Sequence, residues 1–187
     1  MTETAITIIQ WGAIISTSLF AAVIDVKSRR IPNRLCGLLF LAGLLWSFQI
    51  NSFQGLTQAL AASFVLALPF ILLFIFAGGG AGDAKLAGAL GVWLSINESF
   101  IALICIFLAG GILAVIIALY KRKIKYVLMN IILLIFEMAT SFKTKKWITQ
   151  INSAQTATAD VDMNLTMPYS VAIFAGLCSA GCILWLR

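Results

Sequence analysis

The 187-residue sequence contains no histidine and few charged residues, which make up only 11% of the chain. Soluble domains carry roughly 25% charged residues, whereas 61% of this chain is hydrophobic and its mean hydropathy is +1.03. The composition therefore predicts an integral membrane protein with no separate soluble domain. The four cysteines form no CxxC pair, which excludes zinc sites built on histidine or on CxxC, and we expect neither a metal nor another cofactor. The cysteines expected to act as packing residues are Cys36, Cys105, Cys178 and Cys182.

Apolar runs of membrane length define the expected fold. A helix needs about 20 residues to cross the hydrocarbon core, and the chain offers about six such runs. We therefore expect an all-α polytopic membrane protein that forms a single membrane-embedded domain over residues 1–187. Two runs, 35–50 and 84–96, are short and would need tilt or local thinning of the bilayer. The predicted helices cover residues 5–24, 35–50, 57–77, 84–96, 99–119 and 168–186.

Basic residues set the expected orientation of these helices. Twelve of the 13 lysines and arginines fall in three turns, and two of the connections between the helices contain none. The basic turns are 25–34, 78–85 and 120–146, and the connections without basic residues are 51–56 and 97–98. Because cytoplasmic loops carry an excess of lysine and arginine, the basic turns are predicted to be cytoplasmic and the N-terminus to lie outside. The net charge of +6 is thus assigned to topology and not to nucleic-acid binding.

The first apolar run could be mistaken for a secretory signal. Such a signal carries positive charge before its apolar region, whereas here Glu3 precedes the run and basic residues follow it. We therefore expect the run to remain as a transmembrane helix.

One apolar segment, near 126–142, does not fit the six-helix scheme. Lysines and arginines flank it on both sides, so a spanning helix would place one basic cluster outside. We expect an interfacial or re-entrant segment here. Its acidic residue, Glu137, is expected to face solvent or to snorkel rather than to act as a third catalytic acid. The polar stretch 149–167 is predicted to be a loop.

Two of the seven acidic residues, Asp25 and Asp83, stand at the ends of apolar helices. A carboxylate in hydrocarbon costs roughly 2.5–3.5 kcal/mol, so one found there is usually paired, solvated by a cavity or used in chemistry. The predicted topology brings both aspartates to the cytoplasmic face. Neighbouring carboxylates tend to share one proton. Such a pair can hydrolyse a peptide, because one member takes a proton from water while the other donates one to the oxyanion or the leaving amine.

The sequence around the aspartates suggests irregular backbone at the membrane boundary. The glycine-rich run 78–82 precedes Asp83, and residues without Cβ allow the backbone to approach a substrate or another helix closely. Lys85 is expected either to hold negative charge or to snorkel to the interface. The run lacks the Gly-Lys-Ser/Thr ending of a P-loop and follows no predicted strand, which excludes phosphate-loop and dinucleotide motifs. Pro32 is expected to start the second helix at its first turn.

Serine chemistry is a weaker alternative. The serines have no histidine to activate them, so only a dyad with Lys85 is left, and we rank it below the aspartate pair. The serines concerned are Ser16, Ser18, Ser63, Ser99 and Ser170. Small residues along two predicted helices are expected to be packing positions; they are Ala84, Ala87, Gly88, Gly91, Gly176 and Ala180.

Three blocks of the sequence form a recognisable set. Gly80-Ala81-Gly82-Asp83 is similar to the GxGD motif of membrane aspartyl proteases. Asp25 with the stretch 28–33 (Ser-Arg-Arg-Ile-Pro-Asn) comes before it, and the stretch 167–173 (Met-Pro-Tyr-Ser-Val-Ala-Ile) comes after it. Together these blocks resemble the prepilin peptidases of bacterial type IV pilus systems. The resemblance implies a membrane aspartic endopeptidase with Asp25 and Asp83 as the catalytic pair. The motif residues that it implies as support are Gly80, Gly82, Lys85, Arg30, Pro32 and Asn33.

The resemblance also implies substrates and a location. Family substrates are prepilins or pseudopilins, cut after a glycine at the cytoplasmic boundary of the bacterial inner membrane. The implied surroundings are membrane lipids and the pilus assembly machinery. Larger members carry an insert with two cysteine pairs after the first helix, associated with a metal site and with methylation of the new N-terminus. Here that turn is short, which resembles the compact peptidases of tight-adherence (Flp) pili, and Ser170 stands where the family often has glycine.

Other functions could use the same two aspartates. A small ion- or proton-coupled transporter also holds carboxylates in the membrane, but this chain shows neither inverted repeats nor further acids in its helices. A non-catalytic pilus assembly protein is a second alternative, and the presence of both acids argues against it. A presenilin-like protease would hold its acids deeper, whereas these lie beside basic turns.

Overall fold

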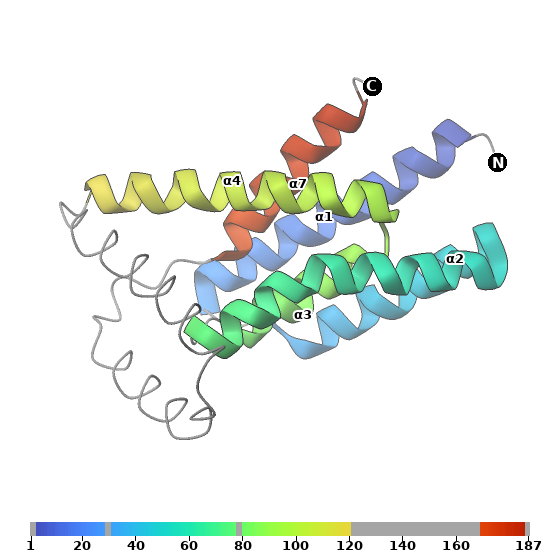
Figure 1. Cartoon of the computed structure of the whole chain (residues 1–187), viewed down its shortest axis with the longest axis horizontal. Helices are drawn as coiled ribbons and strands as arrows, with labels where there is room; N and C mark the ends of the chain where they lie inside the picture. Colours follow the sequence, from blue (N-terminus) through green and yellow to red (C-terminus); the bar gives the residue numbers. More distant parts are fainter. Residues whose placement is uncertain (1–2, 29–30, 78–79, 121–168, 186–187) are drawn as a thin grey trace, which may run out of the picture.

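The computed structural model describes residues 3–28, 31–77, 80–120 and 169–185, and every regular element in these ranges is an α-helix (Figure 1). The prediction of an all-α protein is confirmed for this part of the chain. The segment predicted to be interfacial, 126–142, lies outside the described residues. The helices are α1 (Glu3–Ser28), α2 (Asn33–Ala77), α3 (Ala81–Gly91), α4 (Ile96–Tyr120) and α7 (Tyr169–Trp185).

Helix α2 contains two of the predicted helices, 35–50 and 57–77, folded against each other as a hairpin (Figure 1). The helical geometry breaks at Asn51 and at Ser52, whose φ of 52° is the one positive value among the described non-glycine residues. In a straight helix, Ser47 and Gly55 would be about 12 Å apart, because they are eight residues apart. Here a Cβ at Gly55 would overlap the Ser47 carbonyl oxygen. The chain therefore reverses sharply at this point, and Gly55 is required by the closeness of the two arms.

Helix α1 runs four residues beyond the predicted end at residue 24, and this places Asp25 inside a helix rather than in a turn. The extension has two local causes. Ser28 donates a hydrogen bond to the Ile24 carbonyl oxygen at 2.8 Å, and Lys27 lies in the last turn, where positive charge is favourable.

The boundaries predicted for helix α3 are wrong at both ends. We expected a helix over 84–96, but α3 covers Ala81–Gly91, and its 11 residues rise only about 16 Å. That is shorter than the hydrocarbon core of about 30 Å. The next helix begins at Ile96 instead of 99 because Ser95 and Glu98 form a reciprocal capping box. The Ser95 N–H donates to Glu98 Oε2 at 2.7 Å, and the Glu98 N–H donates to Ser95 Oγ at 3.4 Å.

Three of the described helical stretches are long and apolar enough to cross a membrane, namely 4–28, 33–75 and 96–117. Helix α7, with 17 residues, is a shorter apolar helix. The second stretch contains both arms of the α2 hairpin. The chain is thus a membrane protein by length and composition, and the count of six spans stays a prediction.

The helix ends gather in two sets (Figure 1). The end of α1, the second end of α2 and the beginnings of α3 and α7 lie on one side of the molecule, while both termini and the α2 reversal lie on the other. The basic residues Lys27, Arg34 and Lys85 belong to the first side, called here the basic end. The orientation of this end relative to a membrane stays a prediction from the charge pattern.

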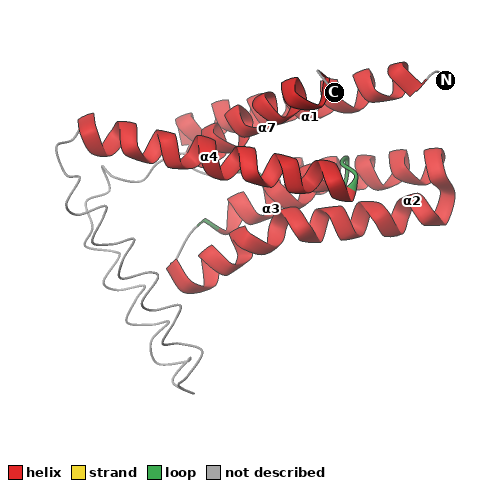
Figure 2. Cartoon of the chain, turned by 45° about the horizontal axis from the view of Figure 1, so that its top comes forward, coloured by secondary structure: helices red, strands yellow, loops and turns green. Residues whose placement is uncertain are grey.

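Close helix contacts hold two groups together (Figure 2). Helix α2 packs on α3, and α7 packs on α4 and α1, with α2 also contacting α4. A Cβ at Gly91 would lie 2.7 Å from Ser63 Cα, and one at Gly176 would lie 2.6 Å from the Ile106 backbone nitrogen. These glycines allow the backbones to touch. All six small residues predicted to pack do so. Ala84 is partly buried against the core, and the other five are buried or have a Cβ position against a neighbouring helix; they are Ala87, Gly88, Gly91, Gly176 and Ala180.

We expect Gly176→Ala to destabilise the protein, because its methyl group would overlap the Ile106 backbone of α4. Overpacking of this kind costs about 1–3 kcal/mol. The measurement is thermal unfolding in detergent. Gly111→Ala is the matched control, since a Cβ there meets nothing within 4 Å, and it should unfold no earlier than the parent protein. Equal unfolding temperatures for the two variants would contradict the close α4–α7 contact.

Candidate functional site

Asp25 lies in the last turn of α1 and is 9% exposed. Its Oδ2 atom accepts a hydrogen bond of 2.6 Å from the hydroxyl of Ser170, the second residue of α7, which is fully buried. The two residues are 145 positions apart in the chain. The contact therefore joins the first and the last of the described helices at the basic end.

Asp83 is the third residue of α3 and lies in its first turn. Gly80 precedes this helix in an extended conformation, and its carbonyl oxygen accepts the Asp83 N–H at 3.1 Å. A Cβ at Gly80 would stand 2.8 Å from Asp83 Oδ2, so the carboxyl group folds back over the start of the helix. Negative charge is favourable there because the first N–H groups of a helix point towards it.

The two carboxyl groups interact electrostatically. Burial, and secondly the charge of Asp25, raise the pKa of Asp83 from 3.8 to about 6. Asp83 stands outside the three long apolar stretches, and its side chain is half-buried rather than enclosed. The pair therefore joins a buried carboxylate on α1 to a more accessible carboxyl group on α3 that binds a proton more readily than an ordinary aspartate.

The turn before α2 packs against the start of α3. A Cβ at Gly82 would lie 3.5 Å from Ile31, and the Lys85 ammonium group donates a hydrogen bond of 3.0 Å to Asn33 Oδ1. Pro32 stands immediately before the first residue of α2, and its carbonyl oxygen accepts the N–H of Leu35 at 3.0 Å. The three sequence blocks thus meet at the basic end. Arg30, the remaining motif residue of the prediction, lies outside the described residues.

A groove of about 450 Å³ opens beside this site between α2 and α3. Its walls are mostly apolar, and Asn33 and Lys85 supply its polar atoms. The lining residues are Asn33, Cys36, Gly37, Phe40, Lys85, Gly88 and Ala89.

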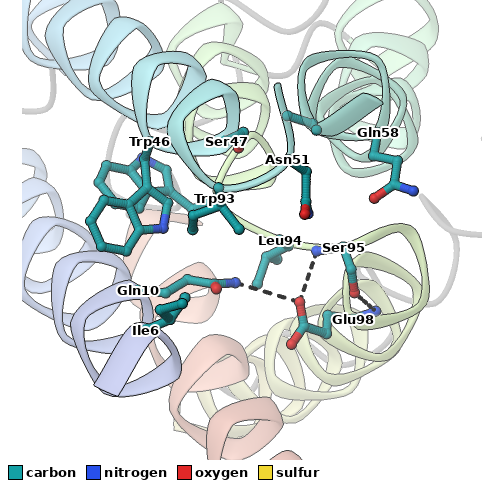
Figure 3. Close-up of a pocket in the computed structure, with 13 residues that line it drawn as sticks. Ile6, Gln10, Trp46, Ser47, Asn51, Gln58, Trp93, Leu94, Ser95 and Glu98 are labelled. Atoms are coloured by element: carbon teal, nitrogen blue, oxygen red, sulfur yellow. Dashed lines mark hydrogen bonds between the residues drawn. The ribbon is translucent and has the colours of Figure 1, made fainter. Parts of the chain in front are cut away.

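A second pocket, of about 150 Å³, is lined by residues of α1, of the α2 reversal and of the α3–α4 turn (Figure 3). Glu98 faces it, with Gln10 Nε2 at 3.5 Å and the stacked rings of Trp46 and Trp93 nearby. The same carboxylate caps α4 through its bond to the Ser95 N–H. We therefore assign Glu98 a structural role, that of fixing the α3–α4 turn against α1.

Sequence reasoning did not identify the contact that Ser170 makes. We considered this serine as a nucleophile with Lys85 and as a departure from the glycine of related sequences, but its hydroxyl donates to Asp25. Ser63 donates to the Gly88 carbonyl oxygen at 2.8 Å, and Lys85 bonds to Asn33. These partners do not support a serine–lysine dyad. The sequence offered one indication of this contact: Ser170 lies near the start of the last predicted helix, on the same predicted side as Asp25.

Comparison with known proteins adds an independent observation. A profile of the type IV leader peptidase family matches residues 12–119. The matched segment includes both aspartates, the turn before α2 and the glycine run, and ends before Ser170. Neither the curated proteins nor the solved structures compared with the chain gave a match. Because the profile covers more than half of the 187 residues, and the resemblance of the three sequence blocks is to the same family, this chain belongs to the type IV leader peptidase family.

Proposed function

We propose that this protein is a membrane aspartic endopeptidase that removes the leader peptide of type IV prepilins, of the Flp-like kind, at the cytoplasmic boundary of the inner membrane. Membership of the family implies a peptidase with prepilin substrates. The observation that carries the aspartic mechanism is the interacting pair of carboxyl groups, Asp25 on α1 and Asp83 on α3. Their place at the basic end suits a peptide bond near the cytoplasmic surface.

The reaction needs only a water molecule and the two carboxyl groups. Asp83, with its raised pKa, carries the proton, and Asp25 acts as the base. Asp25 takes a proton from water as the water oxygen attacks the peptide carbonyl carbon, and Asp83 gives its proton to the carbonyl oxygen. The diol then collapses. The carbon–nitrogen bond breaks, the amine takes the proton from Asp25, and a diol hydroxyl returns one to Asp83, which restores the starting state.

The exposure of the pair suits this division of roles. Asp25 is almost enclosed, so its charge is weakly screened by solvent and acts strongly on a nearby water molecule. Asp83 stands at the emerging end of α3, close to the groove between α2 and α3. A peptide that enters from the basic end would therefore meet the proton donor first.

We expect Asp25→Asn and Asp83→Asn each to abolish cleavage while leaving the fold intact, since the amide keeps the volume but cannot exchange the proton. The loss should be at least about 10²-fold, the lower range for acid–base catalysis. Cleavage of a prepilin by purified protein in lipid is the measurement. Asp160→Asn, in the predicted polar loop, is the matched control and should cleave like the parent protein.

Full cleavage by either of the two catalytic variants would refute the mechanism. Proton or ion flux in proteoliposomes without any cleavage by the parent protein would instead favour the transporter alternative.

The rate of cleavage should fall as pH rises through about 6, because Asp83 must be protonated to donate and its pKa is raised to about 6. Below that pH most Asp83 side chains are protonated, and above it the protonated fraction falls about tenfold for each pH unit. The measurement is kcat/KM across about two pH units on either side of that value. A rate that rises through this range to a plateau would assign the proton donor to another group.

Gly80→Ala should lower kcat without unfolding the protein, because the new methyl group would stand 2.8 Å from Asp83 Oδ2 and displace the carboxyl group. A shift of about 1 Å at a reacting group can cost about 10²-fold in rate. Gly12→Ala, where a Cβ meets nothing within 4 Å, is the control. If both variants cleaved at the rate of the parent protein, the close fit of Gly80 to Asp83 would have no role in the reaction.

A further inference from the structure

The strongest polar contact at the site belongs to Ser170. The Ser170 hydroxyl donates to Asp25 Oδ2 at 2.6 Å, a short hydrogen bond between two oxygens. Both side chains are buried, so solvent has little access to the bond. The bond therefore fixes one oxygen of the Asp25 carboxyl group.

The two aspartates differ in this respect. Asp25 receives a side-chain hydrogen bond, whereas in the described ranges the carboxyl group of Asp83 receives none. The start of α7 therefore orients the carboxyl group of Asp25, and no described side chain does the same for Asp83.

The beginning of α7 is held firmly by the residue before the serine. The Tyr169 ring packs edge-on against Phe70 of α2, with the ring centroids 5.8 Å apart. A Cβ at Gly110 of α4 would lie 2.8 Å from the Tyr169 hydroxyl oxygen, so α4 also contacts this ring closely. Ser170 is thus presented to α1 from a helix that α2 and α4 hold in place.

We propose that Ser170 is a positioning residue that orients the carboxyl group of Asp25, the water-activating member of the pair. The inference rests on the proposed function and extends it to a residue beyond the segment that matches the family. The hydroxyl fixes one carboxylate oxygen, Oδ2, and leaves the other free to take the proton from water. Ser170 itself forms no bond to the substrate and gives up no proton in the reaction.

Substitution of Ser170 separates this role from simple packing. Ser170→Ala should lower kcat about tenfold, the factor that corresponds to 1.4 kcal/mol, with KM nearly unchanged, because substrate binding does not involve the hydroxyl. Ser170→Thr keeps the hydroxyl and should restore most of the rate. Ser170→Val has the shape of threonine without the donor and should be as slow as the alanine variant.

Ser63→Ala is the matched structural control. Ser63 is also a buried serine with a hydrogen bond between helices, but its acceptor is the Gly88 carbonyl oxygen instead of a carboxylate. This variant should unfold at a lower temperature and keep its kcat. Cleavage by Ser170→Ala at the parent rate, or equal rates for the threonine and valine variants, would overturn the proposal. If the alanine variant does not fold, the threonine and valine pair still decides.

Failure of the role proposed for Ser170 can be told apart from failure of the proposed function. If Asp25→Asn cleaves normally, the aspartic mechanism itself is wrong and the serine has no carboxylate to position. If Asp25→Asn is inactive and Ser170→Ala cleaves like the parent protein, only the positioning role is wrong.

Discussion

A carboxylate enclosed in an apolar helix bundle needs partners, and Asp25 is such a carboxylate. Burial of a charged group is tolerated only where hydrogen-bond donors or other charges stabilise it. The fold meets this requirement by bringing the start of α7 to the end of α1, so that a hydroxyl reaches Asp25 Oδ2. It also brings the start of α3, which carries Asp83, near enough for the two acids to influence each other. The positions of three helix ends thus follow from the same constraint.

Small residues make this arrangement possible. Gly91 lets α3 approach the second arm of α2, and Gly176 lets α7 approach α4. These contacts set the positions of α3 and α7, and so bring the start of α7 against the end of α1 and the start of α3 near it. In lipid the hydrophobic effect drives helix association only weakly, so close backbone contact and a few polar bonds determine the geometry. The Ser63–Gly88 bond adds to the stability of the α2–α3 contact.

Much of the fold could be predicted from the sequence, because apolar runs and basic turns are strong signals. The helical class, the runs near α1, α2, α4 and α7, and the placement of both aspartates on one side follow from them. The helix boundaries did not follow. The capping box at Ser95 and Glu98 begins α4 early, but the preceding apolar run extends into it and hides the break. The hairpin in α2 depends on Gly55, whose role appears only when the two arms touch.

The candidate site, like the fold, could be predicted only in part from the sequence. Asp25, Asp83 and the glycine run could be identified from residue type and spacing, since acids and consecutive glycines are rare in an apolar chain. The Ser170 contact could not, because a serine in a membrane helix usually bonds to its own backbone, as Ser18 does with the Ile15 carbonyl oxygen. Only tertiary structure shows that this hydroxyl meets a carboxylate 145 positions away.

Exposure along α3 explains how a buried pair can still reach water. Residues 86–91 of this helix are all buried, whereas its first turn, with Asp83, is not. Because α3 is too short to cross a membrane, its depth is set by the α2 arms around it and not by the bilayer. Hydrolysis needs one water molecule beside a carboxylate that is itself protected from solvent. A short, enclosed helix that emerges only at its first turn meets both requirements, with Asp83 as the side of the pair that is open to water and Asp25 as the side that is not.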